Sequence, residues 1–144
     1  MAASSRRRSR IVAFQALYEA DQSGHPLDKV LARQLADARL APAAAAFAER
    51  LVRGVDGRRE PIDALIEAQA PAFPLTAMAP VDRNVLRLAI FEICFDNHRA
   101  PLAVVINEAV ELAKTFGAEQ SHKYVNGILD KVAHDVRRDE MRRV

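Results

Sequence analysis

Four arginines stand close together near the start of this 144-residue chain, at Arg6, Arg7, Arg8 and Arg10. The planar guanidinium group can form forked hydrogen bonds to phosphate oxygens and to the edges of bases. Residues 1–18 contain no acidic residue, so this segment carries a charge of +4. Such a cluster predicts contact with a polyanion, since each neutralised phosphate releases condensed counterions. The alternative is a solvated basic terminus, which is the usual role of an isolated arginine cluster.

A second group of polar and aromatic side chains lies at the start of the last expected helix, at Gln120, His122, Lys123 and Tyr124. These four provide an amide, an imidazole, a cation and an aromatic ring. Single-stranded RNA is read by stacking on aromatic groups and by hydrogen bonds to base edges, and a helix N-terminus favours a phosphate. The group therefore predicts RNA contact. For Tyr124, a half-buried place in the core is an open alternative.

Catalysis and metal binding find little support in the pattern. The lone cysteine, Cys94, stands in an apolar segment, where a thiol more often fills the core than acts as a nucleophile. Glu119 and His122 match one Glu-x-x-His unit of a di-iron bundle, but that chemistry needs two such units and further carboxylates. Asp130 and His134 form a single pair, which is typical of a surface hydrogen bond. No glycine-rich phosphate loop is present. We expect neither an enzyme nor a bound cofactor or metal.

Composition indicates a cytoplasmic protein with basic ends. Half of the residues are hydrophobic, enough for a core, and no apolar run approaches the length of a membrane span. A single cysteine fits a reducing compartment. The early arginines and the apolar residues after them loosely match an export signal, but Gln15 and Glu19 interrupt it. The net charge of +2 divides into +4 at residues 1–18, +2 at residues 131–144 and −4 between them.

Helical periodicity accounts for most of the chain. Alanine, the strongest helix former, supplies 27 residues, and apolar residues recur at three- and four-residue intervals. We expect an all-α fold of about seven helices in one domain spanning residues 1–144. The helices are expected from about 4 to 23, after Gly24, after Pro42, after Pro61, from 81 to about 95, from Pro101 to Phe116, and from Ser121 to about 136. Residues 71–80, rich in proline, are the expected linker between an N-terminal half (about 4–70) and a C-terminal half (about 81–136).

Three details of these helices lead to further expectations. The segment 81–95 is apolar on more than one face, which predicts a central, mostly buried helix. Gly117 is expected to end the helix before it in the usual C-terminal glycine position. Asn126-Gly127 is normally a hairpin signal, but the helical stripe runs through it. We therefore expect Gly127 to lie within a helix and to allow close packing of a neighbouring one.

Three segments, taken together and in order, carry a resemblance to a known family. They are Arg6-Arg7-Arg8 leading into Gln15-Ala16-Leu17-Tyr18, then Val81-Asp82-Arg83-Asn84-Val85-Leu86-Arg87-Leu88-Ala89 continuing to Glu92, and last a segment from Pro101 through Val105-Ile106-Asn107-Glu108-Ala109 to His122-Lys123-Tyr124-Val125-Asn126-Gly127-Ile128-Leu129-Asp130. In these segments the chain resembles the NusB family over nearly its whole length. The same domain is similar to the front part of some ribosomal RNA cytosine methyltransferases. The chain leaves no room after Val144 for a methyl-donor-binding domain, so we expect a stand-alone factor.

The resemblance implies an all-helical fold of two subdomains and a role in transcription antitermination. It implies binding to the boxA element of ribosomal RNA leader transcripts jointly with NusE, a small-subunit ribosomal protein, in a complex that helps RNA polymerase resist termination. Some relatives self-associate in a way that covers the RNA surface, so the choice between monomer and homodimer stays open. The chain departs from the family pattern at Phe73, where a tryptophan is common, at Met78, near which a basic residue is missing, and at Tyr124, which is more often phenylalanine.

The resemblance also points to particular residues. It places Phe116 near the RNA, although the periodicity favours a core position for this ring. It directs the NusE surface to Tyr18, Asp82 and Arg83, and the acidic middle of the chain would complement a basic ribosomal protein. An alternative for Asp82 is that it caps the helix that follows Pro80. The rival function is a non-catalytic helical scaffold that binds proteins and has basic, solubilising termini.

Overall fold

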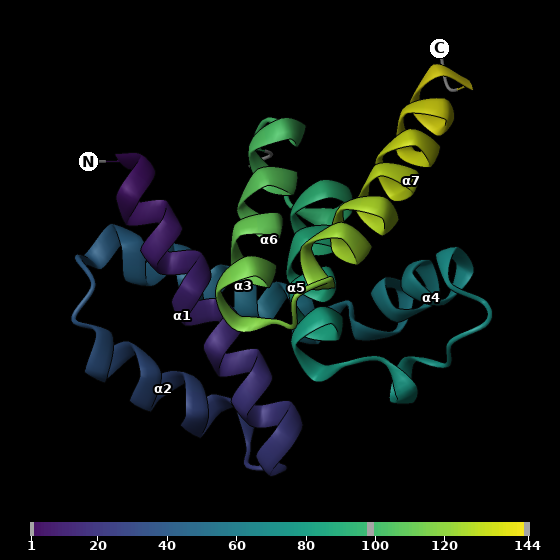
Figure 1. Ribbon diagram of the computed structural model, residues 1–144. Coiled ribbons are helices and arrows are strands. Elements are labelled where there is room, and N and C mark those ends of the chain that lie inside the picture. Colours follow the sequence, from purple (N-terminus) through teal and green to yellow (C-terminus); the bar gives the residue numbers. More distant parts are fainter. Residues whose placement is uncertain (1, 98–99, 143–144) are drawn as a thin grey trace.

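The computed structural model describes residues 2–97 and 100–142, with side chains described over 5–97 and 100–136. Over these residues the chain forms seven α-helices, two short helical turns of other types and no strand (Figure 1). In chain order the elements are α1 (Ala2–Ser23), α2 (Leu27–Ala38), α3 (Pro42–Gly57), α4 (Arg59–Gln69), η1 (Leu75–Ala77), α5 (Pro80–Ile90), η2 (Phe91–Phe95), α6 (Leu102–Phe116) and α7 (Ser121–Arg142). The predicted all-α fold with about seven helices is confirmed.

Prolines and one left-handed residue set several helix boundaries. Pro42 and Pro80 occupy the first positions of α3 and α5, where proline's missing N–H has no intrahelical partner to lose. Helix α2 ends at Ala38, and the next residue, Arg39, adopts the left-handed conformation with φ 51°. Helix α4 differs from the expectation because it begins at Arg59, two residues before Pro61. The first turn tolerates this proline since its N–H groups need no partner within the helix.

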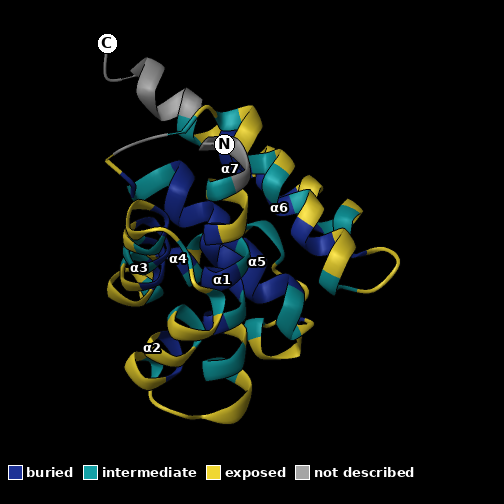
Figure 2. Ribbon diagram, turned by 90° about the vertical axis from the view of Figure 1, so that its left-hand side faces the viewer, coloured by how far each residue is buried: buried dark blue, intermediate teal, exposed yellow. Residues whose placement is uncertain are grey.

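Helix α5 lies at the centre of the molecule, as the sequence predicts. All of its residues from Asp82 to Ile90 are buried, and the helix packs against α1, α4, α6 and α7. In Figure 2 the central helices are dark blue, whereas the outer faces of α2, α3 and α6 are exposed. Because α5 is enclosed on every side, the charged residues within it need partners inside the protein.

The segment after α5 differs from the single continuous helix that the sequence predicts. Residues Phe91–Phe95 form a π-helical turn, which closes with a hydrogen bond of 3.0 Å from the N–H of Asp96 to the carbonyl of Phe91. The ring of Phe91 lies against α3 so tightly that a Cβ built on Gly54 would be 2.1 Å from Phe91 Cζ. A side chain at position 54 therefore has no room.

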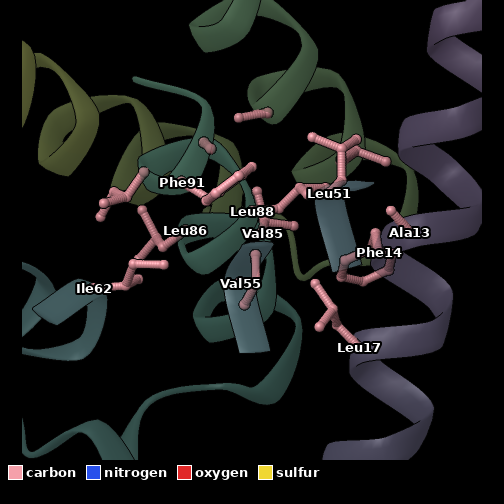
Figure 3. Close-up of a cluster of buried hydrophobic side chains, with 14 of the residues drawn as sticks. Ala13, Phe14, Leu17, Leu51, Val55, Ile62, Val85, Leu86, Leu88 and Phe91 are labelled. Carbon is pink, nitrogen blue, oxygen red and sulfur yellow. The ribbon is translucent and has the colours of Figure 1, made fainter. Parts of the chain in front are cut away.

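One cluster of buried apolar side chains joins the helices. Figure 3 shows part of it, with side chains from α1, α3, α4 and α5 converging around Val85 and Leu88. Each large side chain that is fully removed from water contributes about 1.5–3 kcal/mol. The cluster includes residues from both sides of the 71–80 segment. We therefore propose that residues 71–80 link two halves of the chain in sequence, and that the two halves share one hydrophobic core.

Two expectations about glycine concern α6 and α7. Gly117 ends α6, as predicted, although with φ −96° it is not left-handed, and a Cβ there would lie 2.7 Å from the carbonyl oxygen of Ala113. Ser121 accepts a hydrogen bond of 3.0 Å from the N–H of Ala118 and so closes the connection. Gly127 lies within α7, as predicted, but nothing is found within 4 Å of a Cβ built on it. The expectation that Gly127 allows close helix packing is wrong.

Among the described residues, none of the helices combines the length and the apolar character needed to cross a membrane.

Candidate nucleic-acid interface

Three of the four clustered arginines lie exposed on α1, each held by a different neighbour. The Arg6 guanidinium carbon lies 4.7 Å from the ring centroid of Phe47 in α3. Arg7 Nε donates a hydrogen bond of 3.1 Å to the Glu108 carboxylate of α6. Arg8 donates one of 3.0 Å to the carbonyl of Ala38, at the end of α2. The three side chains are thus oriented by contacts but remain open to solvent and to a ligand.

Arg10 is placed differently from the other three. Its side chain is 4% exposed and forms two hydrogen bonds, of 2.8 and 2.9 Å, to the Glu92 carboxylate, which is 3% exposed. Burial alone would lower the pKa of Arg10, but the hydrogen bonds and charge of Glu92, helped by Glu108, raise it. The buried pair joins α1 to the π-helical turn. We therefore leave Arg10 out of the set proposed to touch RNA and assign it a structural role.

A depression of about 90 Å³ on the α1–α6 seam is lined by both Arg7 and Phe116. Its lining also includes Ile11 and Glu108. The Phe116 ring packs against Phe14 of α1, with 5.1 Å between the ring centroids. Phe116 is therefore partly buried against the core, as its periodicity predicts, and it still faces the depression that Arg7 shares.

The predicted group at the start of α7 divides into exposed and half-buried members. Gln120 and Lys123 are exposed, whereas His122 and Tyr124 are half-buried. The Tyr124 side chain packs against the core cluster. Burial, together with the charge of Asp82, raises the pKa of Tyr124 above its usual range. Tyr124 therefore lies in the half-buried core position that the sequence left as an alternative. Only the part of its side chain that stays exposed could contact a base.

Phe116 also lines a larger cleft of about 650 Å³. Its lining comes from α1, α2, the start of α5 and the end of α6, and includes Phe14, Tyr18, Val81 and Phe116. Tyr18 is 36% exposed, which makes it one of the more exposed large apolar residues among those described. Because Phe116 lines both this cleft and the depression beside Arg7, the two predicted binding surfaces adjoin each other.

Asp82 and Arg83 follow the cleft residue Val81 but are buried and do not line this cleft. Arg83 donates hydrogen bonds of 3.0 and 2.8 Å to the Asp21 carboxylate and two more, of 3.0 Å each, to the carbonyls of Leu75 and Met78. Asp82 is 8% exposed, and its Oδ1 is buried without a hydrogen-bond partner among the described residues. The residue that precedes α5 is Ala79, so Asp82 is not the N-cap, although its charge suits the first turn of the helix.

Sequence reasoning missed the polar network in which Arg83 takes part. Asn84 donates a hydrogen bond of 2.8 Å to Asp21, and Arg87 donates two to Asp63, at 2.8 and 3.1 Å. Burial alone would raise the pKa of Asp21, but the hydrogen bonds from Asn84 and Arg83 outweigh it and hold the pKa below its usual range. The sequence did contain a signal for this network. The segment that forms α5 is apolar on more than one face and also contains two arginines, and buried charges require partners.

Among the described residues there is no group of three or more histidine, cysteine, aspartate or glutamate side chains placed to hold a metal ion. The features that the structure does show on this surface are exposed arginines, partly buried aromatic rings and a cleft.

Comparison with known proteins gives a consistent result. A model of the NusB family matches residues 7–134. The chain is 46% identical over 131 residues to the transcription antitermination protein NusB of Chloroflexus aggregans, covering 90% of this chain and 87% of that protein. It is also 46% identical over 140 residues to the protein of the same name from Anaeromyxobacter dehalogenans, covering 90% and 91%.

Solved structures agree in fold. NusB of T. maritima superposes with a TM-score of 0.83 at 39% identity, covering 90% of each chain. A chain in a crystal structure of the antitermination factors NusB and NusE in complex with double-stranded RNA superposes with a TM-score of 0.82 at 26% identity, covering 94% of this chain and 98% of that one.

Proposed function

Because this chain belongs to the NusB family of transcription antitermination proteins, we propose that it acts by binding the boxA element of ribosomal RNA leader transcripts jointly with NusE. The family is RNA-binding and non-catalytic, so the chain is not an enzyme. The observation that carries the proposal is the group of three consecutive exposed arginines on α1, one of which shares a depression with Phe116.

The RNA surface in this proposal runs from α1 along the α1–α6 seam to the start of α7. The exposed arginines Arg6, Arg7 and Arg8 bind phosphates, since each guanidinium keeps donors free. Phe116 and the exposed part of Tyr124 offer ring surface for a base. The residues Gln120, His122 and Lys123 supply donors and a cation at the N-terminal end of α7, where the helix dipole favours a phosphate.

The NusE surface in this proposal is the cleft beside Phe116. Tyr18 is its direct contact, because a partly exposed tyrosine on a concave surface can bury its ring and keep its hydroxyl hydrogen-bonded. Asp82 and Arg83 act indirectly, by fixing the start of α5 and therefore the position of Val81 in the cleft wall. The complex then acts in the cytoplasm with RNA polymerase, and a homodimer that covers the arginines would compete with RNA.

Titration of a labelled boxA-containing single-stranded RNA by fluorescence anisotropy tests this proposal. Affinity should fall as salt rises, and Arg6→Gln and Arg7→Gln should each weaken the slope of log K against log salt by about 0.7. Arg33→Gln is the matched control: Arg33 is also an exposed, ion-paired helical arginine, on α2. If RNA binding is absent while NusE still binds, the scaffold function replaces the proposed one.

The protein surface is tested by measuring NusE association with the Tyr18→Ala variant. Loss of the ring should weaken NusE association by at least tenfold, the order expected for a central aromatic contact, while RNA affinity measured without NusE stays the same. Equal loss of both affinities would show that the change perturbs the fold and that the cleft assignment is unsupported.

A further inference from the structure

Three guanidinium groups surround the ring of Phe47 on α3. The guanidinium carbons of Arg6, Arg50 and Arg10 lie 4.7, 4.9 and 5.4 Å from its centroid. The face of an aromatic ring attracts cations, so the ring holds these groups in place. Two of the arginines come from α1 and one from α3, which makes Phe47 the meeting point of the two helices' positive charges.

Among the described residues, two carboxylates form ion pairs with these three cations, and the charge of Glu108, which pairs with Arg7, also acts on Arg10. Glu92 pairs with Arg10, and Asp96 pairs with Arg50 at 3.2 Å. Arg6 has no carboxylate partner among the described residues. Both carboxylates are at least 96% buried, so they lie on the inner side of the cluster. The outer side therefore keeps one uncompensated positive charge.

The accessible part of this cluster is formed by Arg6 and Arg50. Arg6 is exposed, and the Arg50 side chain is 37% exposed. A guanidinium held against a ring is pre-organised for an anion, because little side-chain freedom remains to be lost on binding.

We infer that Arg6 and Arg50, on either side of the α1–α3 contact at Phe47, form a phosphate-binding subsite that extends the RNA surface from α1 onto α3. This inference rests on the proposed RNA-binding function, to which it adds Arg50 of α3. One backbone phosphate supplies the missing negative charge and bridges the two side chains. The RNA chain then has contacts on both sides of α1: Arg7 and the α6 seam on one side, and Arg50 on the other.

The test compares Arg50→Gln with Arg53→Gln in the full-length protein. Arg53 is an exposed arginine on the same helix whose charge is satisfied by Glu49 and Asp28. Each variant is titrated with the boxA-containing single-stranded RNA over a series of salt concentrations. Because the phosphate is held only when both guanidinium groups bridge it, Arg50→Gln should reduce the slope of log K against log salt by about 0.7, the value for one lost phosphate contact on a single strand. Arg53→Gln should keep the wild-type slope.

Two further variants separate a phosphate contact from a structural effect. Arg50→Lys keeps the charge and should keep most of the slope. The double variant of Arg6→Gln and Arg50→Gln should lose no more slope than either single change, because both side chains bind the same phosphate. Partial unfolding of Arg50→Gln would lower the fraction of active protein, which circular dichroism measures, but would leave the slope unchanged.

The outcomes distinguish this inference from the proposed function. Wild-type RNA binding with an unchanged slope in Arg50→Gln would overturn the subsite and leave the RNA-binding function intact. A double variant whose slope falls by twice the single value would replace the shared subsite with two separate contacts. If the wild-type protein does not bind the RNA at all, both the function and the subsite are refuted.

Discussion

Replacing Arg10 with methionine should destabilise the fold much more than it changes RNA recognition. The change leaves the Glu92 carboxylate, 3% exposed, without its hydrogen bonds of 2.8 and 2.9 Å. Removing one partner of a buried ion pair costs about 3–5 kcal/mol, because the remaining charge is left in a poorly solvated place. A domain of this size has about 5–15 kcal/mol of stability in total, so this single change should remove a large part of it.

Urea unfolding followed by far-ultraviolet circular dichroism measures the effect through a double-mutant cycle. Arg10→Met should cost the most. Glu92→Met should cost less, since the Glu108 charge also stabilises the Arg10 cation. The double variant should lie close to the wild type, because two apolar side chains of suitable size often replace a buried pair without loss. The coupling free energy is then large and favourable.

Two results would refute this account of Arg10. A cost below about 1 kcal/mol for Arg10→Met would mean that Glu92 reaches water or another cation. A salt slope for RNA binding that falls in Arg10→Met, measured below its unfolding transition, would mean that Arg10 touches phosphate directly. The expected slope is that of the wild type, since a buried guanidinium releases no counterion from RNA.

Three further predictions concern the surroundings of Gly127, Asp21 and Asp82. Gly127→Ala should raise the unfolding free energy by about 0.5–1 kcal/mol in urea titrations, because alanine suits a helix interior and its Cβ meets nothing. The pKa of Asp21 is lowered in the folded state, so its stabilising contribution is present at neutral pH and is lost as the pH falls through that lowered value. Asp21→Asn should therefore lower the free energy of unfolding at pH 7 and reduce the loss of stability at acidic pH. Asp82→Asn should lower the pKa of Tyr124, followed by tyrosinate absorbance in a Tyr18→Phe background.

The helices could be predicted because their signals are local. The stripe from Val105 to Phe116 repeats with the period of one helix face, and it forms α6 with the expected limits. Helix boundaries at Pro42 and Pro80 depend on proline's own geometry. The π-helical turn at 91–95 carries no comparable signal. It depends on how the chain leaves α5 and packs on α3, which no periodicity encodes.

The candidate site was harder to predict because exposure depends on distant partners. Arg6 and Arg10 stand 40° apart around α1 by helical geometry, yet Arg6 is exposed and Arg10 is buried. The difference arises from Glu92, 82 residues further along the chain. Arg83 is hidden in the same way by Asp21. Residue type and angle identified a basic face, whereas the neighbours that neutralise part of it appear only in the folded structure.

The contact between Gly54 and Phe91 has a consequence for how this family can change over time. A Cβ at position 54 would overlap the phenylalanine ring at 2.1 Å, so the two positions cannot vary independently. A larger residue at 54 becomes tolerable only after the ring at 91 has been replaced by a smaller side chain, and that first replacement opens a cavity that costs about 3–5 kcal/mol if the ring is cut back to alanine. Residues 54 and 91 therefore constrain each other's size where α3 meets the π-helical turn.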